Sequence, residues 1–135
     1  MFFLVSQILA VSAVTWANAY DVDNTYNSTA TIHQTTDGGY IMAISGYTTY
    51  VIKLDSYGDI SWQKSLEECG KKVSPSGGIR ETSDRGYVLA GAIWDCGWPC
   101  SSDASNAWIV KLDNSGNILC QYKYGWSSGE RAVSA

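Results

Sequence analysis

The sequence predicts an all-β protein built from two four-stranded antiparallel sheets, and three observations lead to this class. The chain of 135 residues contains 6 Trp, 9 Tyr and 13 Gly, a composition that favours strands joined by tight turns. One pattern of strands and turns occurs twice along the chain. No window after the first residues shows sustained helical periodicity, so helices are not expected in the main body.

Residues 1–19 are expected to be a secretory signal peptide. The apolar run from Phe2 to Trp16 leads into Ala17 and Ala19, the spacing of small residues that precedes a cleavage site. We expect cleavage between Ala19 and Tyr20, and therefore a secreted or cell-surface protein. The alternative is an uncleaved anchor, although the apolar run is shorter than the roughly 20 residues of a membrane-spanning helix.

Residues 20–135 contain one sequence unit twice, at about 31–70 and 78–125. The stretch IHQTTDGGYIMA, which begins at Ile32, aligns with IRETSDRGYVLA, which begins at Ile79. Later in each unit, YVIKLDSYGDISWQ aligns with WIVKLDNSGNILCQ at a larger offset. The second unit therefore carries extra residues in its middle, and the stretch WDCGWPC lies within this insertion.

Each unit is expected to contain four short strands, because runs of β-branched and aromatic residues alternate with turn residues. In the first unit the expected strands are Thr31 to Gln34, Tyr40 to Ser45, Tyr50 to Leu54 and Ile60 to Leu66. In the second unit they are Ile79 to Glu81, Tyr87 to Ile93, Ala107 to Leu112 and Ile118 to Tyr124.

The turn between the first and second strands of each unit needs a residue with positive φ. Gly38 is expected to take this conformation in the first unit, since glycine adopts it without steric cost. Arg85 stands at the matching place in the second unit, so we expect the neighbouring Gly86 to take it there.

The turn between the third and fourth strands is expected to be a type I turn closed by glycine. Gly58 and Gly116 are the expected left-handed residues, and the Asp55 and Asp113 side chains are expected to cap their own turns. The Asp113 stretch lacks the carboxylates of a calcium loop, so turn formation explains it better than metal binding.

A four-stranded antiparallel unit that recurs at this spacing is typical of a propeller blade, because one such sheet cannot bury both faces without neighbours. Both units resemble the blade repeats of secreted bacterial and archaeal β-propeller proteins, with T-x-D-G-G-Y-I-x-A-G followed by K-L-D-x-x-G-x-I-x-W. The Lys-Leu-Asp part is also similar to the repeats of quinoprotein-type propellers. The resemblance covers residues 32–66 and 79–124 and implies two blades of a larger β-propeller. One departure is Cys120, which stands where the first unit has Trp62.

The end of the chain, GERAVSA from Gly129, is expected to be the approach to a third unit. Propellers usually close with about 4 to 8 blades, so we expect the chain to be a fragment of a longer protein. The alternative is a two-blade protein that forms a ring from several copies. In isolation, an open strand edge and an apolar sheet face are expected to allow self-association.

Four cysteines behind an export signal favour disulfide bonds over free thiols. They are Cys69, Cys96, Cys100 and Cys120, and they allow three pairings. One hypothesis pairs Cys96 with Cys100 and Cys69 with Cys120, so that the second bond links neighbouring blades. A thioredoxin-type redox site is disfavoured, because three residues separate Cys96 from Cys100 and no helix pattern follows.

Aromatic residues in or next to loops are the candidate ligand-binding residues. Trp94, Trp98 and Trp126 are predicted to bind a glycan or a protein ligand, since exposed indole rings stack on sugars and anchor interfaces. The alternative is that these rings cap the contacts between blades. The single histidine, His33, is expected on the polar, exposed side of the first strand.

Two functions are compatible with these features. The first is an exported, non-catalytic β-propeller module for extracellular recognition or scaffolding, without cofactors. The second, which rests on fold analogy, is part of a propeller enzyme such as a quinone-dependent dehydrogenase or a glycan-active enzyme. Nucleic acid is not expected as a partner, because the net charge is −4 and the 9 Lys and Arg residues form no basic stripe.

Overall fold

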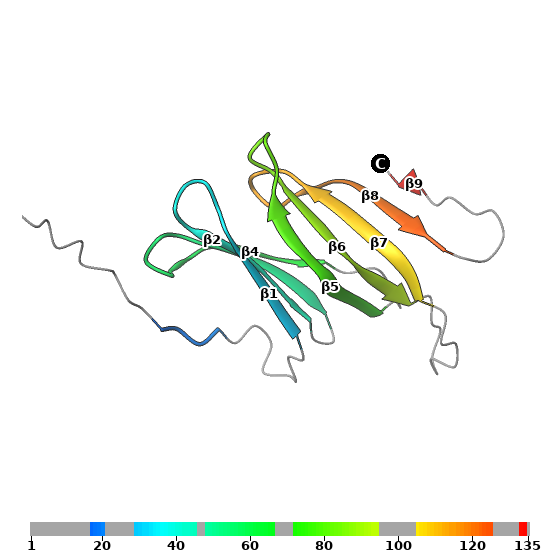
Figure 1. Cartoon of the computed structure of the whole chain (residues 1–135), viewed down its shortest axis with the longest axis horizontal. Helices are drawn as coiled ribbons and strands as arrows, with labels where there is room; N and C mark the ends of the chain where they lie inside the picture. Colours follow the sequence, from blue (N-terminus) through cyan, green and yellow to red (C-terminus); the bar gives the residue numbers. More distant parts are fainter. Residues whose placement is uncertain are drawn as a thin grey trace, which may run out of the picture.

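In a computed structural model, the residues whose positions are described are 17–20, 29–45, 48–66, 72–94, 105–125 and 133–134. Within these ranges the chain forms only strands, arranged in two antiparallel sheets with the orders β1-β2-β3-β4 and β5-β6-β7-β8-β9. We call them sheet A and sheet B; they lie side by side in Figure 1. The prediction of an all-β protein with two antiparallel sheets is confirmed.

Sheet A contains the four strands expected for the first unit. Its strands are β1 (Thr29–Gln34), β2 (Tyr40–Ser45), β3 (Thr49–Leu54) and β4 (Ile60–Leu66). The bounds of β2 and β4 are those predicted from the sequence. Strands adjacent in the sheet are also consecutive along the chain, so the hydrophobic pattern and the tight turns set their pairing locally.

Sheet B contains the four strands expected for the second unit and a fifth that was not predicted. Its strands are β5 (Lys72–Glu81), β6 (Tyr87–Trp94), β7 (Ser105–Leu112), β8 (Ile118–Tyr124) and β9 (Val133–Ser134). The short β9 pairs with the outer edge of β8, with Ser134 opposite Gln121. Part of the edge expected to be open therefore has a hydrogen-bonded neighbour.

Strand β5 begins at Lys72 and not near Ile79 as predicted. The register shifts between Ser74 and Gly78, where β5 carries extra residues against β6. Proline and glycine, which interrupt regular strand pairing, here lie in a bulge within one strand. Gly77 permits the bulge, because a Cβ on it would lie 2.9 Å from the Ala90 Cβ.

The turns between first and second strands agree with the prediction in sheet A and differ from it in sheet B. Gly38 has a φ of 83°, as expected, but in sheet B it is Arg85 that has a positive φ, of 65°. The prediction for Gly86 is therefore wrong. Glycine is required at Gly86 for another reason, since a Cβ there would lie 2.3 Å from the carbonyl oxygen of Leu112.

The turns between third and fourth strands form as predicted. Gly58 and Gly116 have φ values of 86° and 81°. One carboxylate oxygen of Asp55 accepts the backbone N–H groups of Tyr57 and Asp59, at 2.8 and 2.9 Å. The Asp113 carboxylate accepts the corresponding pair of N–H groups in its own turn. These carboxylates stabilise the turns.

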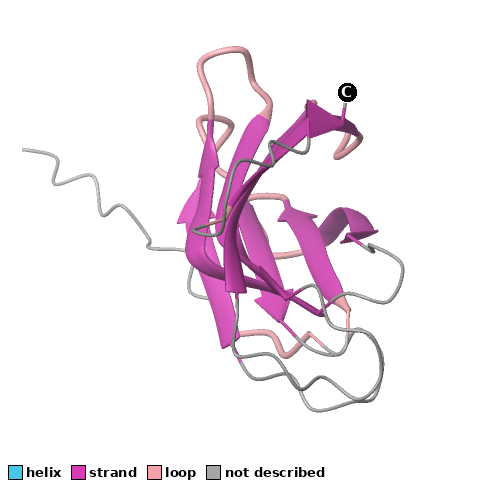
Figure 2. Cartoon of the chain, turned by 90° about the vertical axis from the view of Figure 1, so that its right-hand side faces the viewer, coloured by secondary structure: helices cyan, strands magenta, loops and turns pink. Residues whose placement is uncertain are grey.

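The main hydrophobic core lies between the two sheets, which appear as two layers when the molecule is viewed from its side in Figure 2. Sheet A contributes Ile41, Ala43, Val51 and Leu66 to this core. Sheet B contributes Val73, Ile79, Tyr87, Leu89, Ile93, Trp108, Val110 and Leu112. We call the surfaces that carry these residues the inner faces of sheets A and B.

A second, smaller cluster covers the opposite surface of sheet A, which we call its outer face. This cluster contains the buried side chains Met42, Ile44, Ile52 and Leu54, with Tyr20 and Tyr40 packed against them. The apolar face that was expected to be uncovered is therefore buried in sheet A. The segment 17–20, shown in blue in Figure 1, contributes Tyr20 to this cover.

In the described part of the chain, no helix has the length and apolar character needed to cross a membrane.

Candidate functional site

A hydrogen-bonded corner of titratable and polar groups lies at the first turn of sheet A. The Asp37 carboxylate accepts hydrogen bonds from the Thr35 hydroxyl and, at 2.9 Å, from the Gly39 N–H. The buried Lys53 Nζ lies 2.9 Å from the other Asp37 oxygen and donates to the Leu54 carbonyl at 2.9 Å. The Thr35 hydrogen bond, and then that from Lys53, hold the pKa of Asp37 well below its usual range.

The same arrangement recurs at the first turn of sheet B. Asp84 accepts from the Thr82 hydroxyl and from the Gly86 N–H, and Lys111 Nζ lies 2.9 Å from its carboxylate. The pKa of Asp84 is lowered by the hydrogen bonds from Thr82 and then Lys111. Both carboxylates stay charged at neutral pH because hydroxyl, amide and ammonium donors lower their pKa values, and a general acid or base works best with a pKa near the working pH.

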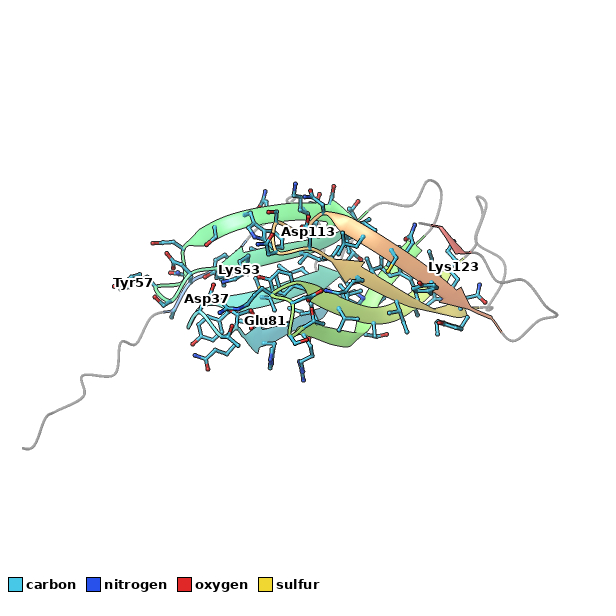
Figure 3. The ribbon with its side chains drawn as sticks, turned by 90° about the horizontal axis from the view of Figure 1, so that it is seen from above. Asp37, Lys53, Tyr57, Glu81, Asp113 and Lys123 are labelled. Carbon is cyan, nitrogen blue, oxygen red and sulfur yellow. The ribbon has the colours of Figure 1, made fainter. Side chains whose placement is uncertain are left out.

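A polar contact joins the two sheets beside these corners. Glu81 accepts the Thr36 N–H at 2.7 Å and the Thr36 hydroxyl at 3.1 Å. In Figure 3, Glu81 lies close to Asp37, which belongs to the same turn as Thr36. Burial, followed by the charges of Glu81 and Asp37, raises the pKa of the neighbouring Tyr87 to about 12.

The described residues hold neither a metal-binding cluster nor an unpaired buried polar side chain. No group of three or more His, Cys, Asp or Glu side chains among the described residues is placed to hold a metal ion. Every buried side-chain nitrogen or oxygen in the same part of the chain has a hydrogen-bond partner. His33 is half-buried and not exposed as predicted, because the odd positions of β1 face β5.

An aromatic rim lies at the end of sheet B opposite the tight turns. Trp94 is the last residue of β6 and Tyr124 the last of β8, and the register brings both to the same end and face of the sheet. Trp94 is half-buried, whereas Tyr124 is 54 % exposed and stacks on Tyr122, with ring centroids 6.5 Å apart. We call Trp94 and Tyr124 the loop rim.

The outer face of sheet B continues from this rim toward the tight turns. It carries the side chains of Val88, Ala90, Ile109, Cys120 and Tyr122. These residues lie opposite one another on paired strands or two positions apart on one strand, so their side chains share a face. Its side chains are half-buried except Tyr122, which is 38 % exposed. Unlike the outer face of sheet A, this face is thus accessible. The negative charge of the neighbouring Cys120 when it is a thiolate, and then the hydrogen bond with Cys120, raise the pKa of Tyr122.

Of the residues predicted to bind a ligand, the structure describes Trp94 alone. Trp98 and Trp126 lie outside the described residues, as do Cys69, Cys96 and Cys100. Within the described residues, Cys120 is a half-buried free thiol. The proposed disulfide pairing therefore stays a prediction.

Sequence reasoning missed Tyr122 and Tyr124, although a signal was present. The first unit has Lys64 and Leu66 at the matching positions, and the second has tyrosine at both. A gain of two aromatic side chains on one face of a strand marks that face as different from its counterpart.

Comparison of the chain with protein-family models, with curated proteins and with solved structures finds no match.

Proposed function

We propose that this chain is an exported, non-catalytic module of β-propeller type, whose loop rim recognises an extracellular glycan or protein. The single observation that carries the proposal is which face of each sheet packs against the other sheet. The inner face of sheet A holds Ile41 and Val51, and the positions that match them in the second unit, Val88 and Ile109, lie on the outer face of sheet B.

The two sheets therefore do not meet through equivalent faces. A sandwich with two-fold symmetry would bring matching faces together, whereas here one face of the first unit meets the opposite face of the second. Stacking in one constant sense is what allows further sheets of the same kind to be added around an axis, as in a propeller. This arrangement favours a β-propeller over a closed two-sheet sandwich.

Recognition is favoured over catalysis by the chemistry of the described residues. The carboxylates with lowered pKa values, Asp37 and Asp84, are held in turns by hydroxyl, amide and ammonium donors. In contrast, Trp94 and Tyr124 are the last residues of β6 and β8, and they present amphipathic rings of the kind that stack on sugars and anchor protein interfaces. Export to an oxidising compartment would be consistent with the cysteine content.

Binding of the exported protein to a glycan array and to cell-surface extracts tests the proposal. We expect a specific ligand whose affinity falls at least about tenfold in Trp94→Ala and in Tyr124→Ala, since aromatic anchors dominate binding energies. Tyr57→Ala is the matched control, because Tyr57 is 68 % exposed but lies in the tight turn at the opposite end. Turnover of an alcohol or sugar substrate with added quinone would contradict the proposal.

A further inference from the structure

Tyr20 occupies, on the outer face of sheet A, a place that matches the place of Trp62 on the inner face of sheet B. The Trp62 ring covers Gly116, where a Cβ would lie 2.6 Å from the ring, and its centroid is 5.8 Å from that of Tyr87. The residues that match Gly116 and Tyr87 in the first unit are Gly58 and Tyr40.

Tyr20 makes the corresponding contacts there. Its hydroxyl donates to the Gly58 carbonyl at 2.5 Å, and Asn18 Nδ2 donates to the same oxygen at 3.2 Å. The Tyr20 side chain packs on the same apolar cluster as Tyr40. Between the sheets, β4 of sheet A places the Trp62 ring on the Gly116 corner of sheet B. The N-terminal segment places the Tyr20 ring in the corresponding position, on the Gly58 corner of sheet A.

The outer face of sheet B is the sequence counterpart of the face that already packs on a neighbour. Val88, Ala90 and Ile109 match Ile41, Ala43 and Val51, which form the contact of sheet A with sheet B. The residues that receive this contact are Tyr87, Leu89, Val110 and Leu112, and their counterparts are Tyr40, Met42, Ile52 and Leu54 on the outer face of sheet A. The inner faces of sheets A and B form one interface within the chain. The outer faces of sheets B and A carry the matching residues, so they could form the same kind of interface between two copies.

The polar contact between the sheets also has a counterpart at the two outer faces. Glu81 of sheet B accepts the N–H of Thr36 of sheet A. The matching residues are Gln34, the last residue of β1, and Ser83 in the first turn of sheet B, and both are exposed. A Gln34 side-chain carbonyl from one copy can accept the Ser83 N–H of another, as Glu81 does from Thr36.

We propose that the outer face of sheet B binds the outer face of sheet A of a second copy of this chain, and that Tyr20 blocks this contact until it leaves. The contact joins different faces of the two copies, so it leads to rings or open chains and not to a closed symmetric pair. Cys120 stands in the place of Trp62, so an incoming copy brings no ring to the Gly58 corner and Tyr20 keeps its position.

This inference goes beyond the proposed function, because it needs neither an external ligand nor export. Sedimentation velocity of the full chain over a range of concentrations tests it. We expect a monomer for the parent chain and tighter apparent association, by about tenfold or more, for Tyr20→Ala, because removing the block raises the fraction of binding-competent molecules. Tyr20→Phe, which loses only the hydrogen bond to Gly58, should lie between the two and replaces Tyr20→Ala if that variant does not fold.

A gain-of-function variant tests the same idea from the other face. Cys120→Trp restores the ring that sheet A has at Trp62, so it should compete with Tyr20 and promote association without any change at the N-terminus. Cys120→Ser is the matched control and should remain monomeric. An unchanged monomer for Tyr20→Ala, Tyr20→Phe and Cys120→Trp would overturn the proposal.

Mixing distinguishes the head-to-tail contact from any other. The double variant Tyr20→Ala/Tyr122→Glu has an open receiving face and a blocked donating face, so it should be monomeric alone. The parent chain has the opposite combination, so a mixture of the two should give a 1:1 complex and nothing larger. Association of the double variant with itself would contradict the assigned faces.

Discussion

Asp37 shows at the residue scale how a half-exposed carboxylate becomes part of the fold. Its oxygens accept from a hydroxyl, an amide and an ammonium group, although the side chain is 51 % exposed. Because the hydrogen bonds from Thr35 and Lys53 lower the pKa of Asp37, the charged form favours the folded state. The repetition of this corner at Asp84 indicates that the Thr-x-Asp-x-Gly sequence and a distant lysine form one structural unit.

We expect Asp37→Asn to lower the free energy of unfolding at pH 7 by about 1 kcal/mol, since the lost charge-assisted hydrogen bonds are partly screened by solvent. A lowered folded-state pKa stabilises the protein above the usual value of 3.8, and this stability is lost as the pH falls from there through the folded-state pKa. The variant should therefore lose less stability than the parent below about pH 4.

Urea unfolding at pH 7, 4 and 3 measures the effect. Thr35→Val keeps the carboxylate but removes the first hydrogen-bond donor, so its acid-dependent loss should lie between those of the parent and Asp37→Asn. Equal losses of stability in acid for the parent and Asp37→Asn would show that this corner does not contribute.

Arg85 is the residue at which the backbone departs from its usual preference. Its φ of 65° costs a non-glycine residue about 1–2 kcal/mol, and glycine would recover this at the expense of greater freedom in the unfolded chain. We expect Arg85→Gly to stabilise the protein by about 0.5 kcal/mol. Thermal unfolding of Arg85→Gly beside Arg85→Ala checks this, and only the glycine variant should gain stability.

At the scale of elements, the turns and strands of one sheet are shaped by the other sheet. Gly116 needs to be glycine both for its φ of 81° and because Trp62 of sheet A covers it. Gly38 has a similar φ of 83°, but a Cβ there would meet only the Ser56 Cβ, at 3.9 Å. The same residue type is thus required for backbone conformation at Gly38, and for conformation and packing together at Gly116.

This pair of turns separates the two effects experimentally. Gly38→Ala should cost about 1–2 kcal/mol, from the backbone alone. Gly116→Ala should cost about 1–3 kcal/mol more, because the added methyl group displaces the Trp62 ring. Chemical denaturation of both variants measures the difference. In a Trp62→Ala background the extra cost at Gly116 should disappear, and its persistence there would contradict the assigned contact.

The whole molecule is held together by a core that belongs to both sheets. Leu89 and Val110 of sheet B and Ile41 and Val51 of sheet A are fully buried in one cluster. Neither sheet has an independent core of this size, so we expect the two to unfold together. The outer faces differ, since that of sheet A is buried and that of sheet B is accessible.

Leu89→Ala should destabilise both sheets by about 2–4 kcal/mol, because the cavity lies between them. Hydrogen exchange should show the loss of protection in β2 and β3 as well as in β6. Leu119→Ala is the control, since this side chain is 52 % exposed and its loss should cost under about 0.5 kcal/mol. A loss of protection confined to sheet B would indicate that the sheets are independent.

Elements that have a local cause could be predicted from the sequence. The strands β2, β4 and β8, the glycine turns at Gly58 and Gly116 and the aspartate caps follow from alternation and from turn chemistry, which involve neighbouring residues. Among the candidate site residues, the sequence pointed to Trp94 but not to Tyr122 or Tyr124, because no local pattern shows which face of a strand stays accessible.

Features that depend on contacts between distant segments could be seen only in the folded chain. These are the bulge that extends β5, the role of Gly86 beside the Leu112 carbonyl, and the burial of the outer face of sheet A, on which Tyr20 packs. The sense in which the sheets stack also belongs here. Each depends on which surfaces meet, and a hydrophobic pattern specifies that a face must be covered without specifying what covers it.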